Sequence, residues 1–404
     1  MVKQNISLLG ATGSIGASTL DLIRLHADKY QIFALSGFSQ TQKLFELCQE
    51  FRPQMVCVAD KDKTDFAKQL AVAKIDTTVV SGQEGLCAIA CDKKVDKVVA
   101  AIVGAAGLIS TFSAIKAGKT VLLANKESLV MAGDLMMQTA KQSNATILPI
   151  DSEHNAIFQC LPRTVQENNT HIHNLDLGIK KLWLTASGGS FLYKSYEQMQ
   201  TATVAQAVKH PNWSMGQKIS IDSSTMMNKG LELIEACHLF NLNESKIDIA
   251  IHPQSIIHSL VEYIDGSLLA QCGTPDMKTP IAHALAYPKR IQSGVMPLNL
   301  FDMAQLEFIA PNIQKFKCLM LAREAIKTGN GACIVLNAVN EVAVSAFLQE
   351  KIALTDIADV VEASLNHQTL SSSLCQTFND LDDILAFDKH ARLTGEAIIN
   401  SKIK

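Results

Sequence analysis

Several features that mark common protein classes are scarce in this sequence. Aromatic residues make up 5% of the 404 residues, with only two tryptophans, Trp183 and Trp213. The net charge is −3, so the chain lacks the basic excess of proteins that bind nucleic acid or anionic membranes. We therefore expect no nucleic-acid partner, and any anionic ligand should be small and bound locally.

Paired cysteines and long hydrophobic runs are also missing. None of the ten cysteines forms a CxxC pair, which is typical of free thiols in a reducing compartment. The apolar stretch 98–109 is interrupted by Gly104 and Gly107 and is shorter than the ~20 residues of a membrane helix. The first apolar run, 6–9, is too short for a secretory signal. We expect a cytoplasmic protein with no membrane partner.

Alternating short apolar runs and helical patterns fill the N-terminal third. Residues 6–9 predict a strand, 10–16 a turn, 17–26 a helix and 32–36 a second strand. Such βαβ units favour an α/β fold with a doubly wound parallel sheet. At a prior of ~150 residues per domain, the length predicts two or three domains.

A glycine-rich turn, GATGSIG at 10–16, joins the first strand to the first helix. Glycines at this place let backbone N–H groups approach a pyrophosphate, although the spacing GxxGxxG also suits a plain tight turn. The second strand ends without the acid that binds the ribose of NAD, which favours NADP. The side chains available there for a 2′-phosphate are Ser39, Gln40 and, further on, Lys43.

Polar residues follow three further apolar runs. Strand-like residues 120–124 lead into Asn125, Lys126 and Glu127, 146–150 lead into 151–153, and 181–185 lead into 187–189. Each could be a simple helix cap. Because ligands of open α/β sheets bind at the carboxyl ends of strands, we expect all three ends to converge on one site.

Two carboxylates, Asp151 and Glu153, stand two residues apart and point the same way if the strand geometry persists. Such a pair repels unless a cation lies between the two groups. Glu232 or Glu235 could supply a third oxygen, and an all-oxygen set suits Mg²⁺ or Mn²⁺. Without a third ligand, the pair would be a solvated helix N-terminus.

The segment 209–235 combines residues suited to an anionic ligand. Ser223 and Ser224 can cap a helix that starts near Thr225, leaving free N–H groups for a phosphate. Asn228 and Lys229 would add a donor and a charge in the first turns. The alternative is an ordinary capped amphipathic helix.

Long motifs in a fixed order carry a family resemblance. The sequence resembles the 1-deoxy-D-xylulose 5-phosphate reductoisomerase family in these stretches: GATGSIG at 10–16, ANKESLV at 124–130, DSEHNAIFQ at 151–159, TASGG at 185–189, HPNWSMG at 210–216, DSSTMMNKGLE at 222–232, HPQSIIHSLVEY at 252–263, PDMKTPI at 275–281 and NAVNEVAV at 337–344.

The resemblance implies roles for individual residues. It places the metal on Asp151, Glu153 and Glu232, and catalytic roles on Lys126, Glu153, His210 and Glu232. It implies substrate contacts at Lys126, Ser152, Glu153, Ser187, His210, Ser223, Asn228, Lys229 and Glu232. It implies NADPH contacts at Thr12, Gly13, Ser14, Ile15, Gly37, Asn125, Glu127 and Gly216, to which the residues after the second strand add Ser39 and Gln40.

The resemblance also implies the reaction. The substrate would be a small phosphorylated sugar, 1-deoxy-D-xylulose 5-phosphate, which isomerises to a branched aldehyde that NADPH reduces to 2-C-methyl-D-erythritol 4-phosphate, a precursor of isoprenoids. A bound Mg²⁺ or Mn²⁺ would polarise the ketone as a Lewis acid. A lid at 187–216, carrying Trp213, would exclude water. The family's small residue, Lys and Asn after the second strand are here replaced by Phe38, Ser39 and Gln40.

For the architecture we predict an NADPH-binding domain at 1–150, an α+β catalytic domain at 151–290, a linker at 291–311 and a helical domain at 312–404. The resemblance implies a homodimer that uses the sheet near residues 255–263, and it puts His258 and Met277 near the substrate. Two other hypotheses are a sugar-phosphate dehydrogenase without isomerisation and a non-catalytic NADPH sensor. Neither requires three carboxylates on a metal ion.

Overall fold

The computed structural model describes residues 3–213, 215–303 and 305–403. The chain divides into two compact units. The first consists of Met1–Ser128, Met136–Asn155 and Asp276–Met296, and the second of Leu129–Leu135, Ala156–Pro275 and Pro297–Lys404. The boundaries predicted near residues 150 and 290 and the linker at 291–311 stay predictions.

A seven-stranded sheet forms the centre of the first unit, and every neighbouring pair of its strands is parallel. The sheet order is β4-β3-β2-β1-β5-β6-β7. The strands are β1 (Gln4–Leu9), β2 (Tyr30–Ser36), β3 (Met55–Val58), β4 (Thr78–Ser81), β5 (Lys97–Ala100), β6 (Thr120–Leu123) and β7 (Thr146–Pro149). The predicted α/β fold with a doubly wound parallel sheet is confirmed.

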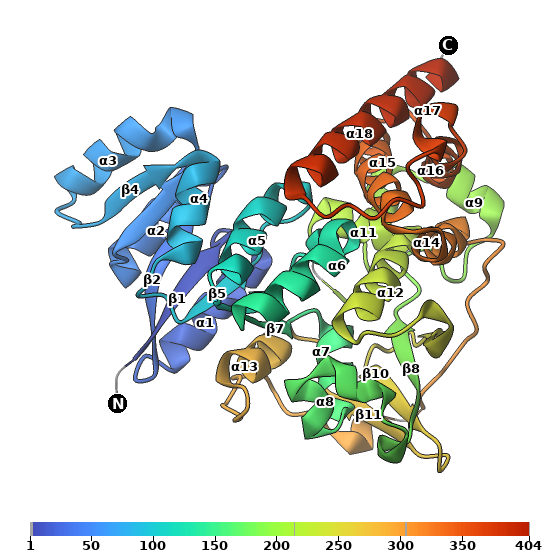
Figure 1. Ribbon diagram of the computed structural model, residues 1–404, viewed down its shortest axis with the longest axis horizontal. Coiled ribbons are helices and arrows are strands. Elements are labelled where there is room, and N and C mark those ends of the chain that lie inside the picture. The colour runs from blue at the N-terminus through green and yellow to red at the C-terminus, as the bar shows by residue number, and fades with distance from the viewer. Residues whose placement is uncertain (1–2, 214, 304, 404) are drawn as a thin grey trace. The chain divides into compact units, whose positions relative to one another are not determined.

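Helices lie in front of and behind this sheet in Figure 1. They are α1 (Ser14–Leu25), α2 (Thr41–Phe51), α3 (Lys63–Val72), α4 (Gly82–Cys91), α5 (Leu108–Lys116) and α13 (Lys278–Ala286), with short 3-10 turns at Asp60–Asp62 and Ala105–Gly107. Two more helices, α6 (Lys126–Ser143) and α7 (Ser152–Cys160), begin in the first unit and run into the second. Helix α13 contacts α1, β6 and β7, which explains why residues 276–296 belong to the first unit.

The central strands are apolar and β-branched because helices cover both faces of the sheet. Ile6, Leu8 and Leu9 of β1 are fully buried, as are Val98 and Val99 of β5. Strand β1 lies between β2 and β5, so the order of the strands reverses there. Ligands of doubly wound folds bind beside such a reversal, outside the carboxyl ends of the strands.

The second unit contains a mixed four-stranded sheet, in the order β11-β10-β8-β9. The strands are β8 (Ile179–Ala186), β9 (Ile247–Ile251), β10 (Ile257–Tyr263) and β11 (Leu268–Cys272). Strand β8 pairs parallel with β9 and antiparallel with β10. Strand β8 therefore belongs to a different sheet from β6 and β7, and the convergence of the three strand ends on one site stays a prediction.

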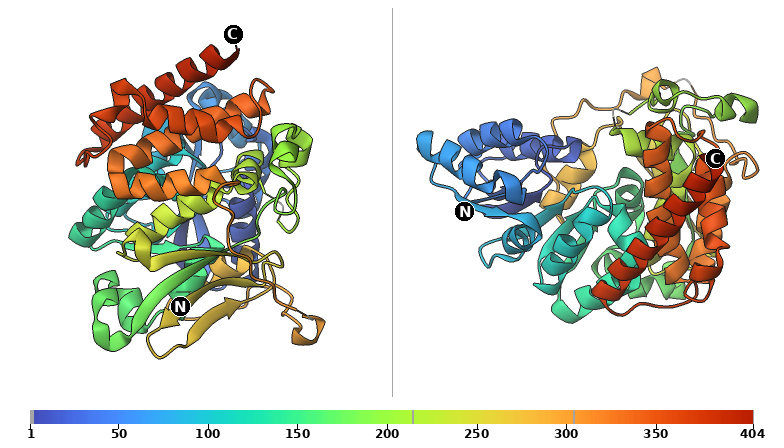
Figure 2. Two further views of the ribbon diagram at one scale, coloured as in Figure 1. Left: turned by 90° about the vertical axis from the view of Figure 1, so that its right-hand side faces the viewer. Right: turned by 90° about the horizontal axis from the view of Figure 1, so that it is seen from above.

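Helices make up the rest of the second unit. They are α8 (Arg163–Glu167), α9 (Tyr196–Gln200), α10 (Val204–Ala207), α11 (Gln217–Ser224), α12 (Met227–Leu239), α14 (Lys317–Thr328), α15 (Asn330–Leu348), α16 (Asp356–Leu365), α17 (Gln368–Ser371) and α18 (Leu381–Ile403). Short 3-10 turns lie at Asn169–His173, Leu175–Leu177, Glu244–Lys246 and Leu300–Asp302. Helix α18 lies along α15 and α16, as Figure 2 shows. The predicted helical C-terminal part is confirmed.

Helix α15 forms the core of this helical part. It contacts α11, α14, α16 and α18. By length and composition alone it could cross a membrane, but 78% of its most apolar stretch is buried inside the protein, as in a core helix. All ten cysteines are free thiols in the described structure, as the sequence predicts.

Candidate functional site

The glycine turn after β1 is built for close approach of a ligand. Gly10 has a φ of 86°, and a Cβ there would lie 2.6 Å from the carbonyl oxygen of Ala101. A Cβ on Gly16 would collide with the carbonyl oxygen of Ala11. Gly13 and Ser14, where α1 begins, are exposed. The turn therefore presents free backbone N–H groups and the positive end of a helix dipole, which suits a pyrophosphate.

The loop after β2 lies against this turn. The Gly10 N–H donates to Ser36 Oγ at 2.9 Å, and a Cβ on Gly37 would lie 3.0 Å from Thr12 Cγ2. The next three residues, 38–40, are exposed and include no acid. Lys43 reaches back from the first turn of α2 and donates to the Thr12 carbonyl oxygen at 2.8 Å. Its ammonium thus stands where the two loops meet.

Asn125 joins the loops that follow β5 and β6. Its side-chain amide donates to the carbonyl oxygens of Ile102 at 2.6 Å and Gly104 at 3.0 Å, and its oxygen accepts from the Ser128 N–H. The amide therefore has a structural function in capping α6. The amide oxygen retains a second lone pair, so a cofactor contact of this residue can use that oxygen or the backbone.

Lys126 and Asp151 form a buried ion pair at the carboxyl ends of β6 and β7, with Nζ and Oδ2 2.6 Å apart. Burial alone would raise the pKa of Asp151. The charge of Lys126 and the nearby His154 ring outweigh that effect and hold the pKa well below its usual range. Asp151 is therefore an anion, as a metal ligand must be.

Glu153 lies on the first turn of α7, and one of its carboxylate oxygens is within 4.8 Å of one from Asp151. Ser152 donates its hydroxyl hydrogen to Glu153 Oε2 at 2.6 Å. The strand geometry does not persist through Glu153, because α7 begins at Ser152. The start of the helix, not the strand pleat, brings the two carboxylates together.

Asn155 is a positioning residue that sequence reasoning missed. Its amide donates to the Pro149 carbonyl oxygen at 2.8 Å and lies 3.2 Å from His283 Nδ1 on α13. Its backbone N–H bonds to the Asp151 carbonyl oxygen at 2.9 Å. Asn155 thereby fixes the start of α7 against the end of β7, and its place inside the DSEHNAIFQ motif was the available signal.

In the second unit, Ser187 directly follows β8. The next two glycines, Gly188 and Gly189, have φ angles of 83° and 66°, a conformation that strains other residues. A Cβ on Gly189 would collide with the carbonyl oxygen of Ser223. These glycines therefore bring the Ser187 loop against the backbone at Ser223.

His210 lies 2.8 Å from Ser187, measured from Nε2 to Oγ. Its Nδ1 accepts the backbone N–H groups of Asn212 and Trp213 at 3.1 and 3.0 Å. Nδ1 thus carries no proton, and in the neutral ring Nε2–H donates to Ser187. Burial lowers the pKa of His210 to about 4, so the ring is neutral near pH 7.

The loop that carries Trp213 lies over the turn before β10. Asn212 donates to the Pro253 carbonyl oxygen at 2.5 Å and to Ser255 Oγ at 3.0 Å. The rings of Trp213 and His258 are 6.1 Å apart. Burial lowers the pKa of His258 to about 4. The loop therefore lies over the imidazole of His258.

Ser223 and Ser224 do not cap the helix that follows them, so that prediction is wrong. They end α11, and Met226, with a φ of 62°, separates α11 from α12. Ser224 donates its hydroxyl hydrogen to the Ala207 carbonyl oxygen at 2.8 Å. Ser223 remains partly exposed beside the Ser187 loop.

Asn228, Lys229 and Glu232 share one face of α12. The Asn228 amide lies 2.5 Å from Glu232 Oε1, and the Lys229 ammonium pairs with Glu232 Oε2. The side chains of Lys229 and Glu232 are 3% and 1% exposed. Glu235, the alternative ligand, is buried on the same helix. A buried ion pair thus joins Lys229, predicted for phosphate binding, to Glu232, predicted for metal binding.

Sequence reasoning also missed a hydrogen bond between Asn340 and Asp222. The buried Asn340 amide of α15 donates to Asp222 Oδ1 at 2.9 Å, and Lys218 pairs with Asp222 Oδ2 at 2.8 Å. Most of the motif that contains Asn340 is buried, as its interpretation as a packing motif requires. Asn340 also holds the end of α11 that carries Ser223.

The predicted site residues fall into two groups. Thr12 to Ile15, Gly37 to Gln40, Asn125 to Glu127 and 151–153 lie at the carboxyl edge of the parallel sheet in the first unit. Ser187, His210, Ser223 and 228–232 lie in the second unit, as does Gly216, where α11 begins. In the first unit, contacts join Thr12 to Gly37 and Lys126 to Asp151. In the second, they join Ser187 to His210, and Asn228 and Lys229 to Glu232.

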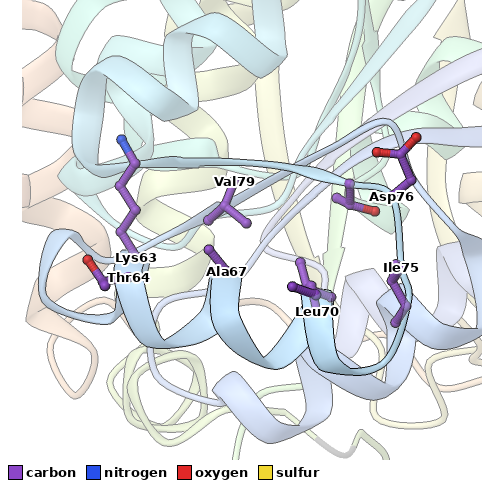
Figure 3. Close-up of a pocket in the computed structure, with 9 residues that line it drawn as sticks. Lys63, Thr64, Ala67, Leu70, Ile75, Asp76 and Val79 are labelled. Carbon is purple, nitrogen blue, oxygen red and sulfur yellow. The ribbon is translucent and has the colours of Figure 1, made fainter.

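A cavity of about 460 Å³ lies elsewhere in the first unit, between α3 and β4 (Figure 3). Its walls are mainly apolar, with Lys63 and Asp76 at opposite ends. It contains none of the residues predicted for cofactor or metal binding. The predicted cofactor site is thus the loops at the carboxyl edge of the sheet.

Family models match most of the chain. Residues 6–133 match the family model 1-deoxy-D-xylulose 5-phosphate reductoisomerase, 147–240 match its C-terminal domain model, and 272–394 match the model named DXP reductoisomerase C-terminal domain. The 1-deoxy-D-xylulose 5-phosphate reductoisomerase of Psychrobacter sp. (strain PRwf-1) is 61% identical over 404 residues, covering 97% of each chain.

Solved structures of similar proteins share the whole fold. A crystal structure of a DOX-P reductoisomerase in complex with NADPH, fosmidomycin and magnesium is 61% identical, covers 98% of each chain and superposes with a TM-score of 0.97. The enzyme of Zymomonas mobilis in complex with NADPH is 44% identical, with a TM-score of 0.89 over 99% of this chain and 100% of that one. This chain belongs to the 1-deoxy-D-xylulose 5-phosphate reductoisomerase family.

Proposed function

We propose that the protein is an NADP-dependent oxidoreductase that isomerises and reduces 1-deoxy-D-xylulose 5-phosphate to 2-C-methyl-D-erythritol 4-phosphate, using NADPH and Mg²⁺. This is the reductoisomerase step of non-mevalonate isoprenoid biosynthesis. The observation that carries the proposal is the 61% identity to a reductoisomerase over 97% of each chain. The predicted residues also have the local geometry that this chemistry needs.

The first unit fits NADPH. The Gly10 and Gly16 positions have no room for a side chain, and the exposed start of α1 can receive a pyrophosphate. The end of β2 offers no carboxylate against a 2′-phosphate. We assign cofactor binding to Thr12, Gly13, Ser14, Ile15, Gly37, Ser39, Gln40, Asn125, Glu127 and Gly216.

The carboxylates fit a hard divalent ion. Asp151 and Glu153 offer oxygens within 4.8 Å of each other, and Asp151 is ionised. We assign Glu232 as the third ligand, following the family pattern. When bound, the metal ion supplies Lewis-acid activation of the ketone and NADPH supplies the hydride. Mn²⁺ would meet the same all-oxygen set, and we propose it as an alternative metal.

The protein's own side chains bind and orient the substrate. Ser187, Ser223, Asn228 and Lys229 bind the phosphate, because they supply hydroxyl, amide and ammonium donors within the second unit. His210 is neutral and its Nε2–H donates to Ser187, so it holds that serine without a charge that titrates near pH 7.

At the reacting end, Lys126 and Ser152 contact the hydroxyl and carbonyl oxygens of the sugar. The Lys126 ammonium lies 2.6 Å from Asp151, and this ion pair fixes its position at the carboxyl edge of the sheet before substrate binds. Ser152 has its hydroxyl 2.6 Å from Glu153. The lid at 187–216 excludes water from the branched aldehyde.

The oligomeric state and the location in the cell are also proposals. Strand β11 is the edge of the second sheet, and Leu268 and Leu269 on it are 55% and 49% exposed. An exposed apolar edge strand can pair with a second copy, which supports a homodimer through this sheet. The free cysteines are consistent with a cytoplasmic location.

One assay tests the function. NADPH oxidation is followed at 340 nm with 1-deoxy-D-xylulose 5-phosphate, with and without EDTA, and the product is identified by mass and NMR spectroscopy. We expect turnover that EDTA abolishes and Mg²⁺ restores, and a branched-chain product. Reduction without a change of the carbon skeleton would favour the dehydrogenase hypothesis. NADPH binding without any turnover would favour the sensor.

A further inference from the structure

Lys315, which is not among the predicted site residues, bonds the turn 191–194 that follows the Ser187 loop. Lys315 Nζ donates to the backbone carbonyl oxygens of Phe191 at 2.6 Å, Leu192 at 2.9 Å and Lys194 at 2.5 Å. An ammonium group has three N–H donors, so these three bonds use all of them. Lys315 thus bonds three carbonyls of one turn from a distance of more than 120 residues in sequence.

Hydrogen bonds and backbone packing join this turn to the residues proposed to bind phosphate. Leu192 N–H points to the Gly189 carbonyl oxygen, and Gly189 packs directly on the backbone of Ser223. Ser190 donates its hydroxyl hydrogen to the Lys209 carbonyl oxygen at 2.7 Å, directly before His210. The same turn therefore sets both the Ser187 loop and the base of the lid.

The turn has other contacts as well, since Phe191 is buried and Tyr193 donates its hydroxyl hydrogen to Glu307 Oε2 at 3.2 Å. A cavity of about 260 Å³ lies beside it, between α9 and the helices that follow Lys315, with Tyr196, Met199, Lys317 and Thr355 among its walls. Side chains across a cavity contribute few packing contacts. On the side of this cavity, the hydrogen bonds from Lys315 therefore contribute more to holding the turn than they would in a filled core.

We propose that Lys315 is a positioning residue for substrate phosphate. It fixes the turn 191–194, and through it the distance between Ser187 and Ser223. This inference rests on the proposed function, because it assigns phosphate binding to those two serines. Carbonyl oxygens that converge on one point need a cation with several donors, which an aliphatic side chain cannot replace.

The decisive variant is Lys315→Met, which keeps an unbranched stem but removes the donors. Lys317→Met is the matched control. Lys317 lies two residues away, but its ammonium pairs with Asp359 and Glu362 on α16 and does not bond the turn. Lys315→Arg restores a cation with several donors, and Lys315→Gln keeps two N–H donors if the methionine variant does not fold.

Steady-state kinetics with the Mg²⁺-loaded enzyme give the first readout. We expect Lys315→Met to raise the KM for the phosphorylated substrate between about tenfold and a hundredfold, as displacement of binding groups does. Lys315→Arg should recover most of the loss, and Lys317→Met should keep the wild-type KM. The affinity for NADPH should be unchanged in all variants. All its proposed contacts except Gly216 lie in the first unit, whereas Lys315 lies in the second.

Calorimetric titration with inorganic phosphate gives a readout without turnover. Lys315→Met should weaken phosphate binding in parallel with the rise in KM. A wild-type KM and wild-type phosphate affinity in folded Lys315→Met or Lys315→Gln would overturn the inference. So would equal losses in Lys317→Met, because they would indicate general destabilisation. If the wild type neither turns over the sugar nor binds phosphate, the proposed function itself fails.

Discussion

Cofactor preference offers the most direct test of the first unit. Two side chains are proposed to contact the 2′-phosphate: Ser39, exposed after β2, and Lys43, whose ammonium donates to the Thr12 carbonyl oxygen. We expect NADPH to be preferred over NADH, because no carboxylate follows β2 to oppose a phosphate. The perturbations are Lys43→Gln, which removes a positive charge, and Ser39→Lys, which adds one.

The magnitude follows from exposure. Lys43 is half-buried and bonded to one carbonyl, so a charge-assisted bond from it to a phosphate contributes ~1 kcal/mol, which is about fivefold in affinity. Lys43→Gln should reduce the NADPH-to-NADH ratio by about that factor. Ser39→Lys should widen the ratio by a similar factor, because it adds one contact of the same kind.

The assay is fluorescence titration of the reduced nicotinamide, which gives Kd for both cofactors, followed by kcat/KM for each. Lys43→Gln should weaken NADPH and leave NADH unchanged. Lys63→Gln, on α3 beside the cavity of Figure 3, is the control and should change neither. Equal weakening of both cofactors by Lys43→Gln would refute this reasoning, because it would show that Lys43 only supports the glycine turn. An unchanged ratio in Ser39→Lys would show that residue 39 does not face the 2′-phosphate.

Three further predictions concern the second unit and the acid range. Glu232→Gln should keep NADPH binding but lose most Mg²⁺-dependent turnover, since a neutral amide replaces an anionic ligand; wild-type metal dependence would show that Glu232 is not a ligand. Tryptophan fluorescence should change when a phosphonate with a metal-chelating hydroxamate binds, and the change should vanish in Trp213→Phe but survive in Trp183→Phe; the reverse pattern would mean that the loop is not the lid. Burial lowers the pKa of His258 and His283 to about 4, so between pH 6.5 and 4 the unfolded chain binds more protons than the folded one. The free energy of unfolding, measured with urea, should therefore be highest above pH 6.5 and fall by on the order of 3 kcal/mol per buried histidine toward pH 4, and an equal value at pH 7.5 and 4.5 would contradict this.

The sequence predicts the first unit well because its signals are local. The strand β1, the turn at 10–16 and the helix α1 are each marked by their own residues, and the parallel order follows from their alternation. The sheet to which a strand belongs is not a local property. The segment 181–185 resembles other strands of an α/β sheet, yet it pairs with β9 and β10 in a second sheet.

The errors at the candidate site have equally specific causes. A cap at Ser223 was a reasonable prediction, but Met226 adopts a left-handed conformation, which non-glycine residues rarely do and which no sequence pattern marks. Contacts of Lys315 and Asn340 join residues more than 100 positions apart. A single sequence contains no signal for such pairs, so only the folded chain identifies them.

The ion pair on α12 couples two proposed binding functions. Glu232 accepts from the Asn228 amide on one oxygen and from the Lys229 ammonium on the other. The carboxylate proposed for the metal ion therefore shares hydrogen bonds with two groups proposed for the phosphate, so a ligand at either place changes the partners of the other. By thermodynamic reciprocity, the factor by which Mg²⁺ changes the affinity for phosphate must equal the factor by which phosphate changes the affinity for Mg²⁺.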